Sequence, residues 1–156
     1  MNKKQKSLTN KGFSLVELII VIAIMAVLIG VLAPQYLKYV ERSRESADLD
    51  NYQTILTALQ VNASDSQATH KLTAGTITFA VNTAPAFATT NAADVLKDAS
   101  ADPSGLKTKS TKYGDAVLTI AVDANNVPTF TTDNSDLAQA LGIKVTPVSY
   151  THLTLP

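Results

Sequence analysis

The feature that most constrains this chain is a run of sixteen uncharged residues, Leu18 to Ala33, with one carboxylate at its edge. A segment this apolar is stable in a membrane or inside a tightly packed helix bundle. Glu17 directly precedes the run, and an ionised side chain within bilayer depth costs roughly 2.5–3.5 kcal/mol on insertion scales. The sequence therefore predicts an apolar helix whose first turn carries a charge that needs a partner.

The length of the apolar run bears on where that charge lies. Sixteen residues at ~1.5 Å each span about 24 Å, which is less than the ~30 Å hydrocarbon core of a bilayer. A span that begins at Phe13 reaches the needed length, but it places Glu17 inside the membrane. One interpretation is therefore a single-pass anchor with Glu17 at the interface, and the other gives Glu17 a specific partner.

A basic leader precedes the apolar run. The first twelve residues contain no acidic residue and four lysines, Lys3, Lys4, Lys6 and Lys11. Gly12 supplies a small residue for a cut before the run, whereas a secretory signal is cut after its apolar stretch. The apolar run would therefore stay in the mature chain, and the lysines predict a cytoplasmic leader with the C-terminal domain outside.

The residues Gly12-Phe13-Ser14-Leu15-Val16-Glu17, followed by the apolar run, resemble the class III leader of type IV prepilins and type II secretion pseudopilins. The resemblance implies that a prepilin peptidase cleaves between Gly12 and Phe13 and N-methylates Phe13. It also implies that Glu17 of an incoming subunit pairs with the Phe13 ammonium of a neighbour in a filament. Pro34 matches the position at which helices of the family kink, and proline removes a backbone donor there.

Beyond Pro34 the pattern predicts that the helix continues to about Val61 and ends in the 62–65 cluster. The spacing assigns its inner face to Leu37, Val40, Ala47, Ile55, Leu56 and Leu59, and its other positions to charges that include Glu41, Asp48 and Asp50. Short helices are expected at 92–99 and 135–141, the second with Asn134 or Ser135 as its cap and Gly142 as its stop. Strands are expected at 77–81, 116–122 and 127–132, the last two joined by the turn 123–126, and Pro128 favours an edge position.

The predicted fold class is α+β and pilin-like, with a long N-terminal helical spine and a small antiparallel β-sheet packed on its C-terminal half. The predicted parts are a cleaved leader (1–12), an apolar transmembrane or filament-core helix (13–33), the amphipathic half of the spine (34–61) and a small globular head (62–147). Residues 148–156 resemble the translation of a DNA-sequencing adapter. We expect that tail to be non-native and the native C-terminus to lie near Pro147.

Composition narrows the function classes. Without the four leader lysines, the 13 basic residues fall to nine against 13 acidic ones, a net charge of −4 that argues against a nucleic-acid-binding stripe. The absence of cysteine excludes a disulfide and favours a monoderm source or a pseudopilin. We read no catalytic set, metal site or cofactor site. His70, the lysines at 107, 109 and 112, the Asp123 turn and the Asn62 glycosylation pattern are interpreted as solvated or structural features.

The predicted function is a structural subunit of a type IV pilus-like extracellular filament, polymerised through its N-terminal helix, with adhesion, motility or DNA uptake as outputs. The alternatives are a major pseudopilin of a type II secretion system and a membrane-anchored binding domain that never polymerises. The expected partners are the prepilin peptidase, other pilin subunits, an inner-membrane assembly platform and an assembly ATPase. The precursor is expected in the membrane and the assembled form at the cell surface.

Overall fold

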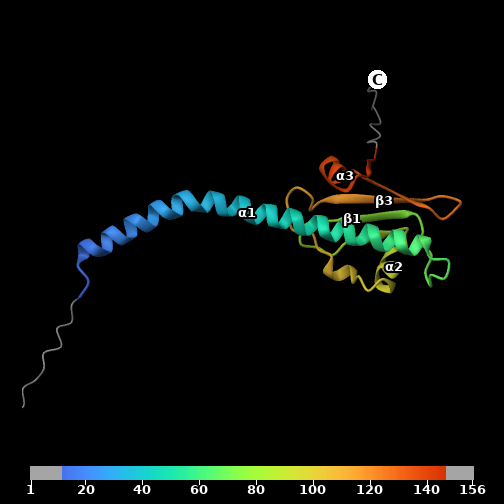
Figure 1. Ribbon diagram of the computed structural model, residues 1–156, viewed down its shortest axis with the longest axis horizontal. Helices are drawn as coiled ribbons and strands as arrows, with labels where there is room; N and C mark the ends of the chain where they lie inside the picture. Colours follow the sequence, from blue (N-terminus) through green and yellow to red (C-terminus); the bar gives the residue numbers. More distant parts are fainter. Residues whose placement is uncertain (1–11, 147–156) are drawn as a thin grey trace, which may run out of the picture. The chain divides into compact units, whose positions relative to one another are not determined.

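The computed structural model describes residues 12–146 (Figure 1). The chain divides after Tyr39 into two compact units, Met1–Tyr39 and Val40–Pro156. Of the described residues, 12–39 contain the apolar part of a helix, and 40–146 form the head with the remainder of that helix. Most of the predicted leader and all of the predicted non-native tail lie outside the described residues.

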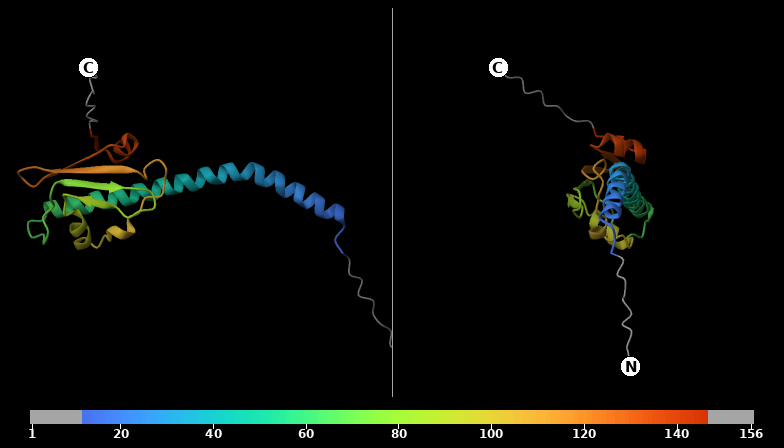
Figure 2. Two further views of the ribbon diagram at one scale, coloured as in Figure 1. Left: turned by 180° about the vertical axis from the view of Figure 1, so that it is seen from behind. Right: turned by 90° about the vertical axis from the view of Figure 1, so that its left-hand side faces the viewer.

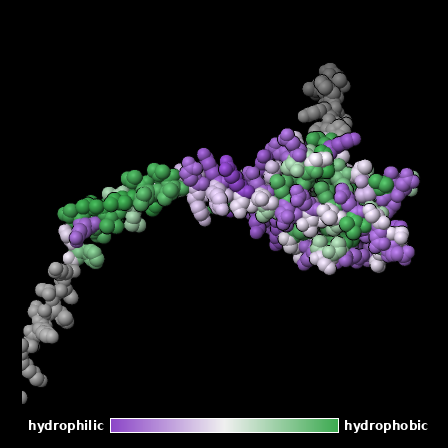
Figure 3. Space-filling view, in the orientation of Figure 1, coloured by the Kyte–Doolittle hydropathy of each residue, from purple (hydrophilic) through white to green (hydrophobic). Residues whose placement is uncertain are grey.

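Helix α1, Leu15–Ser64, contains 50 residues and supplies the main element of both units. It is helical through Pro34, so the predicted kink at that residue stays a prediction. From residue 12 to residue 39 every apolar side chain is exposed. The apolar stretch of α1 is the green surface in Figure 3. Among the described residues, α1 is the one helix long and apolar enough to cross a membrane.

The head contains one five-stranded sheet. Strands of this sheet lie alongside α1 in the left view of Figure 2. Its strands are β1 (Gly75–Phe79), β2 (Ala86–Ala88), β3 (Ala116–Val122), β4 (Pro128–Thr132) and β5 (Lys144–Val145), in the spatial order β2-β1-β3-β4-β5. All pairs are antiparallel except β4 with β5, which is parallel. The head also has helices α2 (Ala92–Asp98) and α3 (Ser135–Leu141) and the 3₁₀ turn η1 (Pro103–Gly105).

The core of the head lies between α1 and the sheet. Tyr52, Ile55 and Leu59 recur at three- and four-residue intervals on α1, and all three are fully buried. The strands alternate, so that Ile77 in β1 and Leu118 in β3 are buried while their neighbours point to the other face. The rings of Tyr52 and Phe79 meet edge to face with centroids 4.6 Å apart. The α+β, pilin-like fold class is therefore confirmed.

Several local predictions are confirmed. The 116–122 and 128–132 hairpin and the 135–141 helix are present, and the Asn134 side chain accepts from the Leu137 N–H at the start of that helix. Gly142 ends it in the left-handed region, with φ of 68°. The predicted helix at 92–99 ends one residue earlier, and the first strand lies at 75–79 instead of 77–81. Helix α1 ends at Ser64, three residues after the predicted end.

The edge position predicted for β4 is wrong. Strand β5 pairs with Thr131 and Thr132, which places β4 inside the sheet. Pro128 is tolerated because it is the first residue of β4 and β5 pairs only with the other end of the strand. Strands β2 and β5 were not predicted, because three and two residues are too short to show an alternating pattern.

Candidate functional site

The start of α1 brings the predicted processing and assembly residues together. Gly12 and Phe13 precede the helix, Ser14 occupies its N-cap position and Leu15 is the first helical residue. The Ser14 carbonyl accepts from the Leu18 N–H at 3.2 Å, as expected for an N-cap. The predicted scissile peptide between Gly12 and Phe13 therefore lies outside the helix, where no helical hydrogen bonds hold it.

Glu17 has a partner in its own chain. The Ser14 backbone N–H donates to Glu17 Oε2 at 2.9 Å. This contact is one half of a capping box, in which a Glu three residues after the N-cap reaches back to the N-cap N–H. Sequence reasoning treated Glu17 as a charge without a local partner and missed this bond, although the Ser-x-x-Glu spacing of residues 14–17 is its known signature.

The surroundings of Glu17 are apolar and open. Phe13, Glu17, Leu18 and Val21 line one shallow hollow beside the helix start, and the Phe13 side chain is 94% exposed. The site therefore places an aromatic residue, a carboxylate and an aliphatic helix face side by side. This combination suits docking of another apolar segment that carries a positive charge.

Small residues lie along the apolar part of α1. Ala23, Ala26 and Gly30 recur at spacings of three and four, which places them on one face of the helix. A Cβ added at Gly30 would meet no atom of the described residues within 4 Å, so no contact among them requires a glycine there. Small residues of this kind allow close approach of helices in membranes.

In the head, Asp48 is buried, although the helical pattern predicted a solvent-facing position for it. The carboxylate is 0% exposed and accepts hydrogen bonds from the Lys109 N–H, at 2.8 and 3.0 Å, and from the Ser110 N–H, at 2.7 Å. A buried carboxylate is tolerated when backbone donors satisfy it. Asp48 therefore anchors the 107–112 loop to α1.

A second carboxylate on α1 holds the same loop. Glu41 Oε1 accepts from the Thr111 N–H at 2.6 Å and from the Thr111 hydroxyl at 2.8 Å. These hydrogen bonds hold the pKa of Glu41 below its usual value. The Tyr52 hydroxyl also donates to the Tyr113 carbonyl at 2.8 Å, and burial raises the Tyr52 pKa.

The lysines of the loop remain at the surface. Lys107, Lys109 and Lys112 are exposed while Thr108 and Ser110 between them are buried. Lys112 Nζ lies 5.2 Å from the centroid of the Tyr113 ring. The backbone of the loop thus bonds to α1 while its lysine side chains face solvent, in agreement with the prediction that these lysines are solvated.

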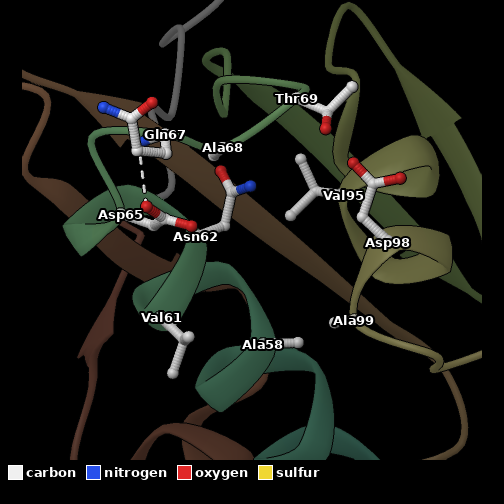
Figure 4. Close-up of a pocket in the computed structure, with 10 residues that line it drawn as sticks. All are labelled: Ala58, Val61, Asn62, Asp65, Gln67, Ala68, Thr69, Val95, Asp98 and Ala99. Carbon is white, nitrogen blue, oxygen red and sulfur yellow. Dashed lines mark hydrogen bonds between the residues drawn. The ribbon is translucent and has the colours of Figure 1, made fainter.

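Asn62 lines a hollow between the end of α1, the 65–69 loop and α2 (Figure 4). Figure 4 shows Asn62 from α1 and Asp98 from α2 on opposite sides, with Val95 between them. His70 Nδ1 lies 2.8 Å from Asp98 Oδ2, and this hydrogen bond raises the pKa of His70. The contact holds the loop against α2.

The side chain of Asn62 is used for structure. Its Nδ2 donates to the His70 carbonyl at 2.8 Å, and its Oδ1 accepts from the Leu72 N–H at 3.2 Å. Asp123 is similarly used in its turn, where Oδ1 accepts from the N–H groups of Asn125 and Val127. Within residues 12–146, no three His, Asp or Glu side chains are grouped as metal ligands.

Comparison with known proteins identifies the motif at the start of the chain. Residues 8–33 match the family model of the prokaryotic N-terminal methylation motif, which contains Gly12, Phe13 and Glu17. The chain therefore carries the class III prepilin leader typical of type IV pilins and pseudopilins, on a pilin-like α+β fold. This motif points to a structural subunit. No solved structure matches the chain.

Proposed function

We propose that this protein is a structural subunit of a type IV pilus-like extracellular filament. The observation that carries the proposal is the methylation motif at 8–33, together with Glu17 in the first turn of an apolar helix that the rest of the described residues leave exposed. An apolar surface of this size requires a membrane or other helices around it. The membrane surrounds the helix before assembly, and the helices of other subunits surround it in the filament.

Processing is the first step. The prepilin peptidase cleaves between Gly12 and Phe13 and methylates the new Phe13 amine. Placement of both residues before the helix supports this proposal, because a peptidase binds extended chain more readily than helix. Until assembly the subunit stays in the membrane, with the head outside.

Assembly is the second step. The platform and its ATPase extract the subunit, and the apolar helix packs against its copies while Glu17 pairs with the Phe13 ammonium of a neighbour. Two opposite charges attract strongly where water is excluded, but only close geometry offsets their desolvation. A kink at Pro34 would let the apolar half adjust to the filament core.

A major pseudopilin of a type II secretion system uses the same motif and the same helix, and it is the second candidate. Adhesion, motility and DNA uptake are outputs of the pilus candidate. A retraction ATPase gene next to this gene would favour a pilus, and a secretin gene would favour secretion. A membrane-anchored binding domain that does not polymerise is the candidate from another class.

The mature N-terminus tests the proposal. Mass spectrometry of the chain from its native host should find N-methyl-Phe13 as the first residue. Gly12→Val should block cleavage, because a branched side chain crowds the peptidase site, whereas Lys11→Arg serves as a control that keeps the charge. An intact leader on the wild-type chain in a cell with active prepilin peptidase would reject the proposal in favour of the simple anchor.

A further inference from the structure

The two oxygens of the Glu17 carboxylate have different surroundings. Oε2 accepts from the Ser14 N–H of the same chain at 2.9 Å. Oε1 makes no hydrogen bond to any group within residues 12–146. Since a carboxylate offers about four acceptor sites on its two oxygens, one bond leaves ample capacity for a second partner.

We propose that Glu17 divides its carboxylate between two partners, with Oε2 on the Ser14 N–H of its own helix and Oε1 on the Phe13 ammonium of the neighbouring subunit. The inference rests on the proposed function, because the second partner exists only in a filament. The Ser14 N–H is then a positioning group that orients the carboxylate before assembly begins.

The arrangement has two physical consequences. A hydrogen bond to an ionised acceptor is about twice as strong as a neutral one, so the charge of Glu17 is partly satisfied in the isolated precursor. The bond also restricts the side-chain torsions in advance, which reduces the entropy lost when the neighbour binds. Glu17 therefore enters the filament with its carboxylate already oriented, and the neighbour's Phe13 ammonium binds to Oε1, which accepts no hydrogen bond within residues 12–146.

Nuclear magnetic resonance on the uncleaved full chain in detergent micelles tests the first half of the proposal. The chemical shift of the Ser14 amide proton should change during a pH titration of Glu17. The residue-14 amide proton should change equally in Ser14→Ala, because alanine keeps the N–H. Glu17→Gln should abolish the shift yet keep the Ser14 amide protected from exchange, because Gln also accepts in a capping box. The inference would be overturned if the chemical shift of the wild-type Ser14 amide did not change with pH and its proton exchanged as fast as that of Phe13.

Ser14→Pro tests the second half. Proline has no N–H and is well tolerated where a helix begins, so the variant removes the donor and keeps the helix. Ser14→Ala is the matched control, because it loses the hydroxyl and keeps the donor. Among cleaved chains, we expect about tenfold less of the Ser14→Pro variant than of the Ser14→Ala variant in sheared filaments, the factor that loss of one hydrogen bond to a charged group predicts.

The two measurements separate the inference from the function on which it rests. Equal incorporation of the Ser14→Pro and Ser14→Ala variants would refute the positioning role while leaving the pilin function intact. Absence of wild-type filaments would refute the proposed function, whereas the titration would still report on the Ser14 bond. If the Ser14→Pro variant is not cleaved, the titration still decides the first half of the proposal, and its failure there overturns the inference.

Discussion

Replacement of Asp48 by alanine should strongly destabilise the head. The carboxylate is fully buried and satisfies two backbone donors, the N–H groups of Lys109 and Ser110. A buried donor left without a partner costs roughly 1–3 kcal/mol. Water reaches the exposed Lys109 more easily than the buried Ser110, so we expect Asp48→Ala to lower the free energy of unfolding by about 3 kcal/mol.

Asp50→Ala is the matched control. Asp50 lies on the same helix but is exposed, and the gain in helix propensity from Asp to Ala is the same at both positions. We expect Asp50→Ala to change stability by no more than about 0.5 kcal/mol. Asp48→Asn should give an intermediate loss, because the amide keeps one acceptor oxygen and turns its NH₂ group toward a donor.

Urea unfolding of the full chain in detergent micelles measures the effect. Tyr52 and Tyr113 are buried beside the anchored loop, so near-ultraviolet circular dichroism of tyrosine reports on this region. The midpoint should fall for Asp48→Ala with an unchanged slope. If the free energies of unfolding of Asp48→Ala and Asp50→Ala lie within about 0.5 kcal/mol of each other, the role assigned to the Asp48 carboxylate is refuted.

Three further changes have defined outcomes. Gly114→Ala should destabilise the head by about 2 kcal/mol, because a Cβ there would overlap the Ser110 carbonyl, while Gly105→Ala enters open space and should be near neutral by urea unfolding. The hydrogen bond to Asp98 raises the pKa of His70, so the contact contributes stability fully below the pKa of His in the unfolded chain, and this stability is lost as the pH rises through the pKa of His70 in the folded protein. Hydrogen exchange of the Leu72 amide, which lies beside this contact, should therefore increase as the pH rises through that range. An equal increase in Asp98→Asn would contradict this prediction. Glu17→Val should be cleaved normally but excluded from filaments, and normal filaments from that chain would remove the pairing role.

The elements that the sequence predicted correctly depend on neighbouring residues. The apolar run, the 116–132 hairpin and the cap and stop of α3 each carry their signal within a few residues, as with Asn134 and Gly142. The motif at 8–33 is equally local, and it indicates the class of the protein without any knowledge of the fold. The same local reasoning should have found the Ser14–Glu17 capping box, because both residues lie within one turn.

Contacts between distant residues were decided only by the tertiary structure. Asp48 looked like a solvent-facing charge because its donors, Lys109 and Ser110, lie 61 and 62 residues away. Strand β5 is two residues long and is a strand because it pairs with Thr131 and Thr132 of β4. The same pairing places β4 inside the sheet and not at its edge. By itself, the sequence determined the leader, the apolar helix and the charge at its start, since periodicity and caps act within a few residues. Which carboxylate is buried and which strand lies at the edge depend on hydrogen bonds that exist only after the chain has folded.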